Sequence, residues 1–166
     1  ESGDQGIFIA EDDSAIKPAA TPPNVQANAV RKATPKALNP ERTLILGWNR
    51  RGPIIANELS RYVAPGSHLT IAANSEKLDS DTDNLAIEGH NLTVELIVTD
   101  TTNRSSLEGL NIPGYDHVLV LGYSDDLAAQ IADTRTLVTL LHLRQIADKA
   151  NCHISVVSEM IDVRNR

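Results

Sequence analysis

The sequence predicts a Rossmann-like α/β fold, a doubly wound and mainly parallel sheet with helices on both faces. Three observations predict it. From residue 42 onward, short β-branched runs alternate with stretches of helical periodicity, which is typical of β-α-β units. The run 117–121 is almost entirely apolar, as in an interior strand of a parallel sheet. A glycine turn, 47–52, stands between the first strand and the first helix, where dinucleotide-binding folds hold their phosphate loop.

Each element follows from local composition. The strand segments are short, apolar and bounded by turn residues. The first helix places Ile54, Ile55 and Leu59 at helical spacing, and Pro65-Gly66 ends it. The long helix repeats leucine and isoleucine at the same spacing. The predicted strands are 43–46, 69–73, 92–98, 117–121 and 153–157. The predicted helices are 52–63, 103–110 and 125–149, with a turn at 113–114.

Two N-terminal regions differ from the rest of the chain. Residues 1–16 hold a short apolar run and then three acids, which predicts one strand ending in a turn. Residues 17–41 contain five of the eight prolines, so they are expected to form a linker before the Rossmann-like domain of 42–166. Because the chain begins at Glu1 without a methionine, we expect it to be a piece of a longer protein.

Charge and composition exclude several classes of function. The chain has 166 residues, with 15 basic and 22 acidic side chains and a formal net charge of −7. This balance disfavours broad binding to nucleic acid or to anionic lipid, both of which reward a basic surface. A single cysteine, Cys152, excludes an intrachain disulfide and a multi-cysteine zinc site. No stretch approaches the roughly 20 apolar residues of a spanning helix.

The glycine turn is the main candidate for ligand binding. Gly47 and Gly52 match the first and third glycines of the G-x-G-x-x-G motif, but Asn49 replaces the middle one and would crowd a pyrophosphate. Arg50 and Arg51 add positive charge beside the first helix. Two interpretations stay open: the turn binds a nucleotide, or it has kept its shape and lost the nucleotide.

Three further side chains lie in the turn or are expected near it at the same edge of the sheet. The acid expected after the second strand, to bind a ribose, is here Asn74. Asp100 follows the third strand and is the best acid to line a shared cleft at that edge of the sheet. Trp48 has three possible roles: stacking on an adenine, contacting a neighbouring subunit, or covering the sheet edge.

Acidic residues suggest a second, cationic ligand. Asp79, Asp81 and Asp83 form a D-x-D-x-D run like the start of a calcium loop, although the glycine and the final glutamate of an EF-hand are missing. A solvated acidic loop is the alternative. Asp125 and Asp126 open the long predicted helix, and Asp126 in particular is expected to cap it.

Nothing in the sequence indicates an enzyme. The histidines lack metal-ligand spacing, and there is no G-x-S-x-G element. A rival hypothesis is the NAD(P)-binding domain of an oxidoreductase. It would require an intact glycine motif, an acid at Asn74 and a catalytic Tyr-Lys pair or histidine, and none is evident.

With these residues placed, the chain resembles the RCK domain (regulator of conductance of potassium, TrkA-N type). Within that family it is similar to the CASTOR/POLLUX group of ion channels and their bacterial relatives. The similar segments are the turn 47–52, Ala64–Ser67, Val98–Thr102 with Leu107, Asp116–Gly122 followed by Asp125–Asp126, and Leu137–Arg144.

The resemblance implies a cytosolic, non-enzymatic gating-ring domain of a cation or potassium channel. Residues 1–16 would be the remnant of a preceding module, and 42–166 the N-lobe of the second. The implied partners are other RCK modules in a homo-oligomer and the pore domain, at the cytoplasmic face of a membrane. The implied ligand is a nucleotide of NAD type or Ca²⁺, with Gly122 added to the candidate binding residues. A purely structural ring component without a ligand is the remaining alternative.

Overall fold

The computed structural model describes residues 38–74, 78, 91–162 and 164, all within the compact unit Ala37–Arg166. The predicted N-terminal strand, most of the proline-rich linker and the acids Asp79, Asp81 and Asp83 lie outside the described residues.

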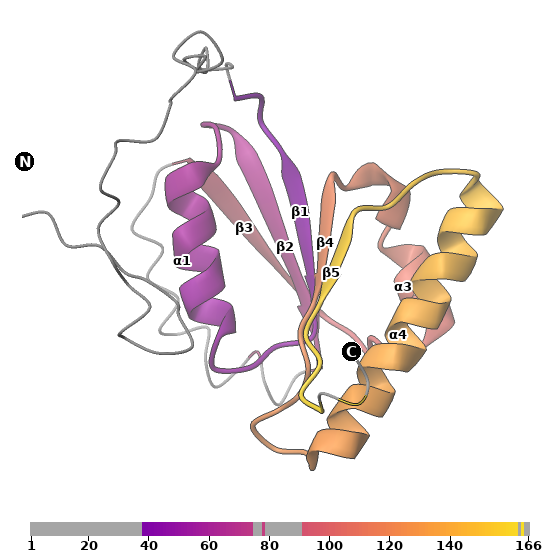
Figure 1. Ribbon diagram of the computed structural model, residues 1–166. Helices are drawn as coiled ribbons and strands as arrows, with labels where there is room; N and C mark the ends of the chain where they lie inside the picture. Colours follow the sequence, from indigo (N-terminus) through magenta and orange to yellow (C-terminus); the bar gives the residue numbers. More distant parts are fainter. Residues whose placement is uncertain (1–37, 75–77, 79–90, 163, 165–166) are drawn as a thin grey trace, which may run out of the picture. The chain divides into compact units, whose positions relative to one another are not determined.

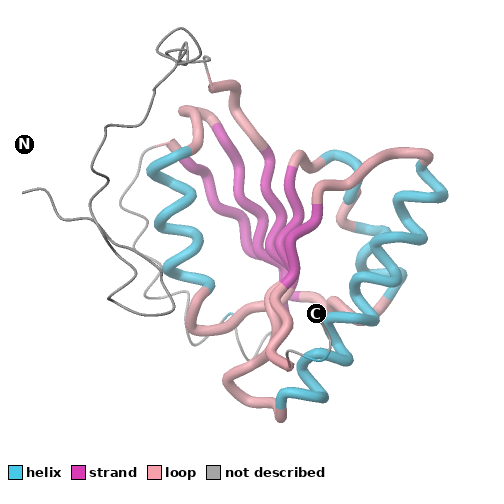
Figure 2. The backbone as a smooth tube through the Cα atoms, in the orientation of Figure 1, coloured by secondary structure: helices cyan, strands magenta, loops and turns pink. Residues whose placement is uncertain are grey.

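The described residues form a five-stranded, all-parallel sheet of order β3-β2-β1-β4-β5 (Figures 1 and 2). This order places β1 at the centre. Strands β2 and β3 lie on one side of β1, and β4 and β5 lie on the other, as in Rossmann-like domains. The predicted fold is therefore confirmed. The strands are β1 Arg42–Leu46, β2 Ser67–Ala73, β3 Leu92–Val98, β4 His117–Val120 and β5 Val156–Ser158.

Helices cover both faces of the sheet. Helix α1, Gly52–Tyr62, lies on one face, and α3, Arg104–Gly109, and α4, Ala129–Ala150, lie on the other (Figure 1). The alternation of side chains along β1 explains the two layers. Leu44 and Leu46 point into the apolar core under α3 and α4, whereas Ile45 points into the core under α1. No helix within the described ranges combines the length and the apolar character needed to cross a bilayer.

The register brings the ends of separate strands to one edge. Leu46 pairs with Ala72 of β2 and with Val120 of β4. The backbone N–H of Gly47 donates to Ala72 O at 2.9 Å, and the N–H of Glu159 donates to Val120 O at 2.9 Å. The segments that follow β1, β2, β4 and β5 therefore meet at the carboxyl edge of the sheet.

Two predicted boundaries are wrong. The long helix begins at Ala129 rather than at 125, because residues before it first form a separate turn in which Leu127 N–H donates to Tyr123 O. Ala128 is the N-cap and carries no capping side chain, so neither Asp125 nor Asp126 occupies the N-cap position of α4.

The last strand begins at Val156 rather than at 153, because only its final three residues pair with β4. After α3, the predicted turn at 113–114 is a short 3-10 helix, Ile112–Gly114.

Candidate functional site

Both glycines of the turn are required by their surroundings. Gly47 has a φ of +84°, and a Cβ there would lie 2.3 Å from the carbonyl oxygen of Leu121. A Cβ on Gly52 would lie 2.6 Å from the ring of Trp48. The first glycine thus permits the tight turn beside β4, and the second lets helix α1 pack onto the indole.

Trp48 is a core residue. Its side chain is fully buried in the cluster that also contains Ala56 of α1 and Ile71 of β2. Within the described part of the chain, its indole N–H has no hydrogen-bond partner. The ring therefore packs under α1, and no face of the indole is open to a ligand.

Asn49 stands at the position where a nucleotide motif has its middle glycine. Its side chain is fully buried, and Nδ2 donates both to Gly122 O and to Glu159 Oε2, each at 2.7 Å. Its Oδ1 accepts from Arg51 N–H at 2.9 Å. The asparagine therefore ties the turn after β1 to the chain segments after β4 and β5.

Glu159 belongs to this group of contacts, and the sequence did not predict it. Its carboxylate accepts from Asn49 Nδ2 and, at 3.1 Å, from Gly122 N–H, and it forms an ion pair with Arg51 Nη1. The side chain is only 13% exposed. Its place directly after the fifth strand was the available signal, because this position also lies at the carboxyl edge of the sheet. We call Asn49, Arg51, Gly122 and Glu159 the glycine-turn cluster.

Arg50 and Asp125 form a second, more exposed contact at this edge. The Arg50 N–H donates to Asp125 Oδ2 at 2.7 Å, and the Arg50 side chain, 81% exposed, lies 3.7 Å from the same carboxylate. Asp125 thus stabilises the turn before α1. An exposed pair of this kind contributes little to stability.

Asn74 follows β2 and Asp100 follows β3. Within the described ranges, the side-chain hydrogen bonds of these two residues do not join them to the glycine-turn cluster. Among the described residues, Asn74 Oδ1 is buried without a partner. Asp100 accepts from the hydroxyl of Thr102 at 2.7 Å and from its N–H at 2.9 Å. These bonds, with a smaller contribution from Arg135, lower the pKa of the Asp100 carboxyl below its ordinary value.

The structure therefore brings together part of the predicted site. Gly47, Asn49, Arg51, Gly52 and Gly122 converge on one turn, while Trp48 faces the core and Arg50 points outward. Among the described residues, no group of three or more His, Cys, Asp or Glu side chains is arranged to hold a metal ion.

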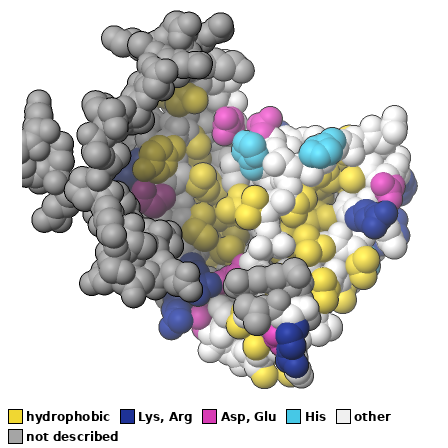
Figure 3. All heavy atoms as spheres, in the orientation of Figure 1, with side chains coloured by type: hydrophobic (Ala, Val, Ile, Leu, Met, Phe, Trp, Pro, Cys, Tyr) yellow, Lys and Arg dark blue, Asp and Glu magenta, His cyan; other side chains and the backbone are white. Residues whose placement is uncertain are grey.

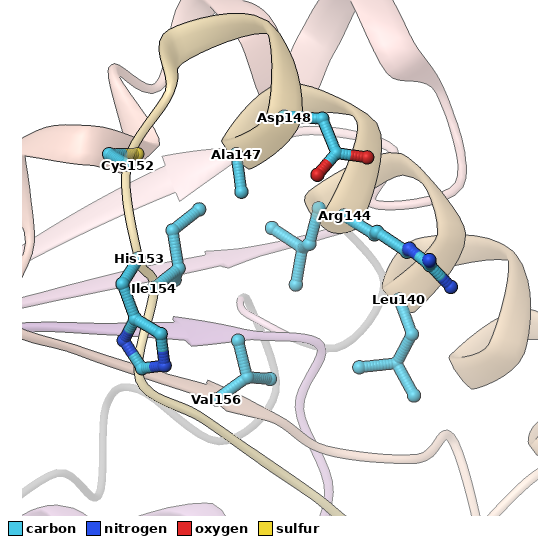
Figure 4. A pocket seen from close by; sticks show the side chains of 9 residues that line it. Leu140, Arg144, Ala147, Asp148, Cys152, His153, Ile154 and Val156 are labelled. Carbon is cyan, nitrogen blue, oxygen red and sulfur yellow. The ribbon is translucent and has the colours of Figure 1, made fainter.

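A separate hollow of about 330 Å³ lies between the second half of α4 and the segment that leads into β5 (Figure 4). Leu140, Arg144 and Asp148 approach it from the helix, and His153 and Val156 from the other side. Apolar side chains are visible at the surface in this region (Figure 3). None of the predicted site residues lines it.

The strand order, the two-sided helices and the glycine turn define a Rossmann-like domain of the kind that can bind dinucleotides. In this chain, however, a carboxylate of the protein already accepts from two side chains of the turn, Asn49 and Arg51, and from the backbone N–H of Gly122 after β4. The chemistry available there is anion recognition, with Glu159 as the anion.

The chain is homologous to one segment of the CASTOR and POLLUX ion channels. It is 32% identical over 158 residues to the probable ion channel CASTOR of Oryza sativa subsp. japonica, and 29% identical over 168 residues to the ion channel CASTOR of Lotus japonicus. It is 31% identical over 156 residues to the probable ion channel POLLUX of the same rice. These alignments cover 90%, 96% and 90% of this chain, but only 17%, 19% and 16% of the relatives. The chain thus spans less than a fifth of their length.

Comparisons of family models and folds add less. No family model matches the chain. The human SLO3 gating ring has a TM-score of 0.48 at 6% identity, over 75% of this chain and 20% of that chain. An NADH-dependent reductase complexed with NAD has a TM-score of 0.46 at 18% identity, over 73% of this chain and 59% of that chain.

Proposed function

We propose that this chain is a regulatory module of a cation channel, of the RCK type, at the cytoplasmic face of a membrane. The observation that carries the proposal is the similarity to ion channels over about nine tenths of the chain. In this role the domain performs no catalysis. It changes the free-energy difference between closed and open arrangements of the pore through contacts with other parts of the channel.

Assembly into a ring with other RCK modules and attachment to the pore domain are part of the proposal. Large apolar side chains on the described surface support such contacts: Ile131 is 55% exposed, Leu141 59% and Val157 67%. Apolar groups of this size are often covered by a partner. The excess of acidic residues continues to disfavour nucleic acid as that partner.

Ligand coupling is the finer part of the proposal. A ligand moves a gating equilibrium only if it binds the two conformations with unequal affinity. A nucleotide of NAD type at the glycine turn and Ca²⁺ at Asp79, Asp81 and Asp83 are the two candidates. Glu159 already accepts from Asn49 and Arg51 of the turn. This contact favours a third possibility, a module that regulates through assembly without a ligand of its own.

The alternative class is an NAD(P)-binding oxidoreductase domain. Asn49 and Glu159 argue against it. Asn49 Oδ1 accepts the backbone N–H of Arg51 in the turn, and Glu159 accepts from the side chains of Asn49 and Arg51, which could otherwise meet a pyrophosphate. Asn74 also replaces the acid that would bind the ribose hydroxyls.

The test is electrical recording from the natural protein that contains this chain, reconstituted in planar bilayers. We expect cation currents whose open probability changes in Arg51→Ala while the unit conductance stays that of the unmodified protein. Arg61→Ala, an exposed arginine on α1, is the matched control and should leave both quantities unchanged. Absence of current, or a change confined to unit conductance, would contradict a regulatory role.

A further inference from the structure

We propose that Glu159 is a built-in anionic occupant of the glycine turn, and that the segment Glu159–Asp162 is a latch that closes this turn to a diphosphate group. The inference does not depend on the channel role, because it concerns only contacts within the described domain. The proposal gives Glu159 an autoinhibitory function. This residue lies two positions after the predicted end of the last strand, 153–157.

The first step of the argument is the convergence of donors. Asn49 Nδ2, Gly122 N–H and Arg51 Nη1 come from two separate strand ends, and all three meet on the carboxylate of Glu159. An amide, a backbone N–H and a guanidinium are the groups that also recognise phosphate oxygens. Glu159 therefore has the bonding environment of a bound anion.

The second step is the burial of these groups. Asn49 is fully buried and the Glu159 side chain is only 13% exposed, so both face each other away from bulk water. A diphosphate at the turn would need the same donors and would place its negative charge beside the carboxylate. Two like charges in one poorly hydrated space exclude each other. Either Glu159 or the diphosphate can occupy the turn, but not both.

The third step is a second attachment of the same segment. Asp133 of α4, which is 1% exposed, accepts from Ile161 N–H and from Asp162 N–H, each at 2.9 Å. The segment after β5 is thus held at Glu159 by the glycine turn, and two and three residues later by Asp133 of α4. Release of Glu159 would loosen a segment that α4 also holds, which links occupancy of the turn to the position of that segment.

Gly122 shows how closely the latch covers the turn. A Cβ on Gly122 would lie 3.7 Å from Glu159 Oε2 and 4.0 Å from Ile161 Cδ1. Glu159 and Ile161 of the latch therefore pack directly over the turn after β4.

The test uses inorganic pyrophosphate as the probe and the whole 166-residue chain. Isothermal titration calorimetry is expected to show binding at least tenfold tighter in Glu159→Ala than in the unmodified chain. The added affinity should disappear in Glu159→Ala with Arg51→Ala. Hydrogen exchange at the amides of Ile161 and Asp162 should be faster in Glu159→Ala. Glu108→Gln, an exposed glutamate on α3, is the control and should match the unmodified chain in both measurements.

Glu159→Gln keeps the size of the side chain. It is the second test variant, to be used if Glu159→Ala does not fold. It should bind pyrophosphate more tightly than the unmodified chain, because the like charge is gone. Equal binding by the unmodified chain and by whichever variant folds would overturn the proposal, and so would a folded variant that binds no pyrophosphate. Neither result would bear on the channel currents, so the two proposals fail separately.

Discussion

Asn49 Nδ2 lies 2.7 Å from Glu159 Oε2, and this bond joins the turn after β1 to the segment after β5 across 110 positions of sequence. In a nucleotide-binding turn the position of Asn49 is a glycine, which leaves room for a phosphate. Here an amide side chain stands at that position and donates to a carboxylate. The shape of the turn is retained, while its hydrogen-bonding capacity is used within the protein.

Replacing Asn49 with glycine would restore the middle glycine of the motif and remove the bonds to Gly122 and Glu159. We expect the free energy of unfolding to fall by about 1–3 kcal/mol, because buried groups lose their partners. Urea denaturation measures this change. Asn111→Gly is the control and should be nearly neutral, since Asn111 has a φ of +51° that glycine adopts readily. Equal losses in both variants would contradict the role given to Asn49.

Gly47→Ala should destabilise the domain by about 2–3 kcal/mol, because the new Cβ meets Leu121 O at a backbone conformation that alanine disfavours. Gly109→Ala is the matched control, since a Cβ there contacts nothing within 4 Å. Thermal unfolding of the two variants should therefore differ clearly. A stable Gly47→Ala protein would show that the turn can move away from β4.

Asp133→Asn should weaken the attachment of the segment after β5. The carboxylate accepts two backbone N–H groups, and an amide offers only one accepting oxygen, so we expect a loss of about 1–3 kcal/mol in stability. Faster hydrogen exchange at Ile161 and Asp162 should accompany it. Asp148→Asn, on the exposed side of α4, should change neither quantity. Unaltered exchange in Asp133→Asn would remove the second attachment from the latch.

The lowered pKa of Asp100 predicts that the free energy of unfolding depends slightly on pH. Thr102 lowers the pKa of this carboxyl in the folded state, so its contribution is present above the unfolded pKa and is lost as pH falls through the folded pKa. Thr102→Val removes the hydroxyl bond and should raise the pKa of Asp100 toward the ordinary value. An NMR titration of the Asp100 carboxyl carbon measures this. An unchanged titration would mean that the Thr102 N–H alone sets the pKa.

NADH and ATP should leave the melting temperature of the unmodified chain unchanged, because Glu159 holds the donors of the turn. A ligand present at 100 times its Kd would add about 2.7 kcal/mol of stability, so binding would be seen readily. A separate titration with Ca²⁺ examines Asp79, Asp81 and Asp83. A clear shift with NADH would favour the nucleotide hypothesis over a module that has no ligand.

The sequence by itself determined the Rossmann-like class, the existence of every described strand and long helix, and the resemblance to ion channels. These follow from local properties: the alternation of apolar runs, helical spacing, and the glycines beside β1. It also placed Gly47, Asn49 and Arg51 in one turn, and the resemblance added Gly122 to the candidate binding residues. It did not predict the start of α4, since the turn before it depends on a bond between Leu127 and Tyr123.

The tertiary structure alone decided which group of the protein contacts the turn. Glu159 is far from the turn in sequence, and only the parallel register of β1, β4 and β5 brings its carboxylate to Asn49. Likewise, only packing against α1 shows that Trp48 belongs to the core. Local patterns specify which elements form, whereas the partners of a polar side chain are set by which strand ends lie side by side.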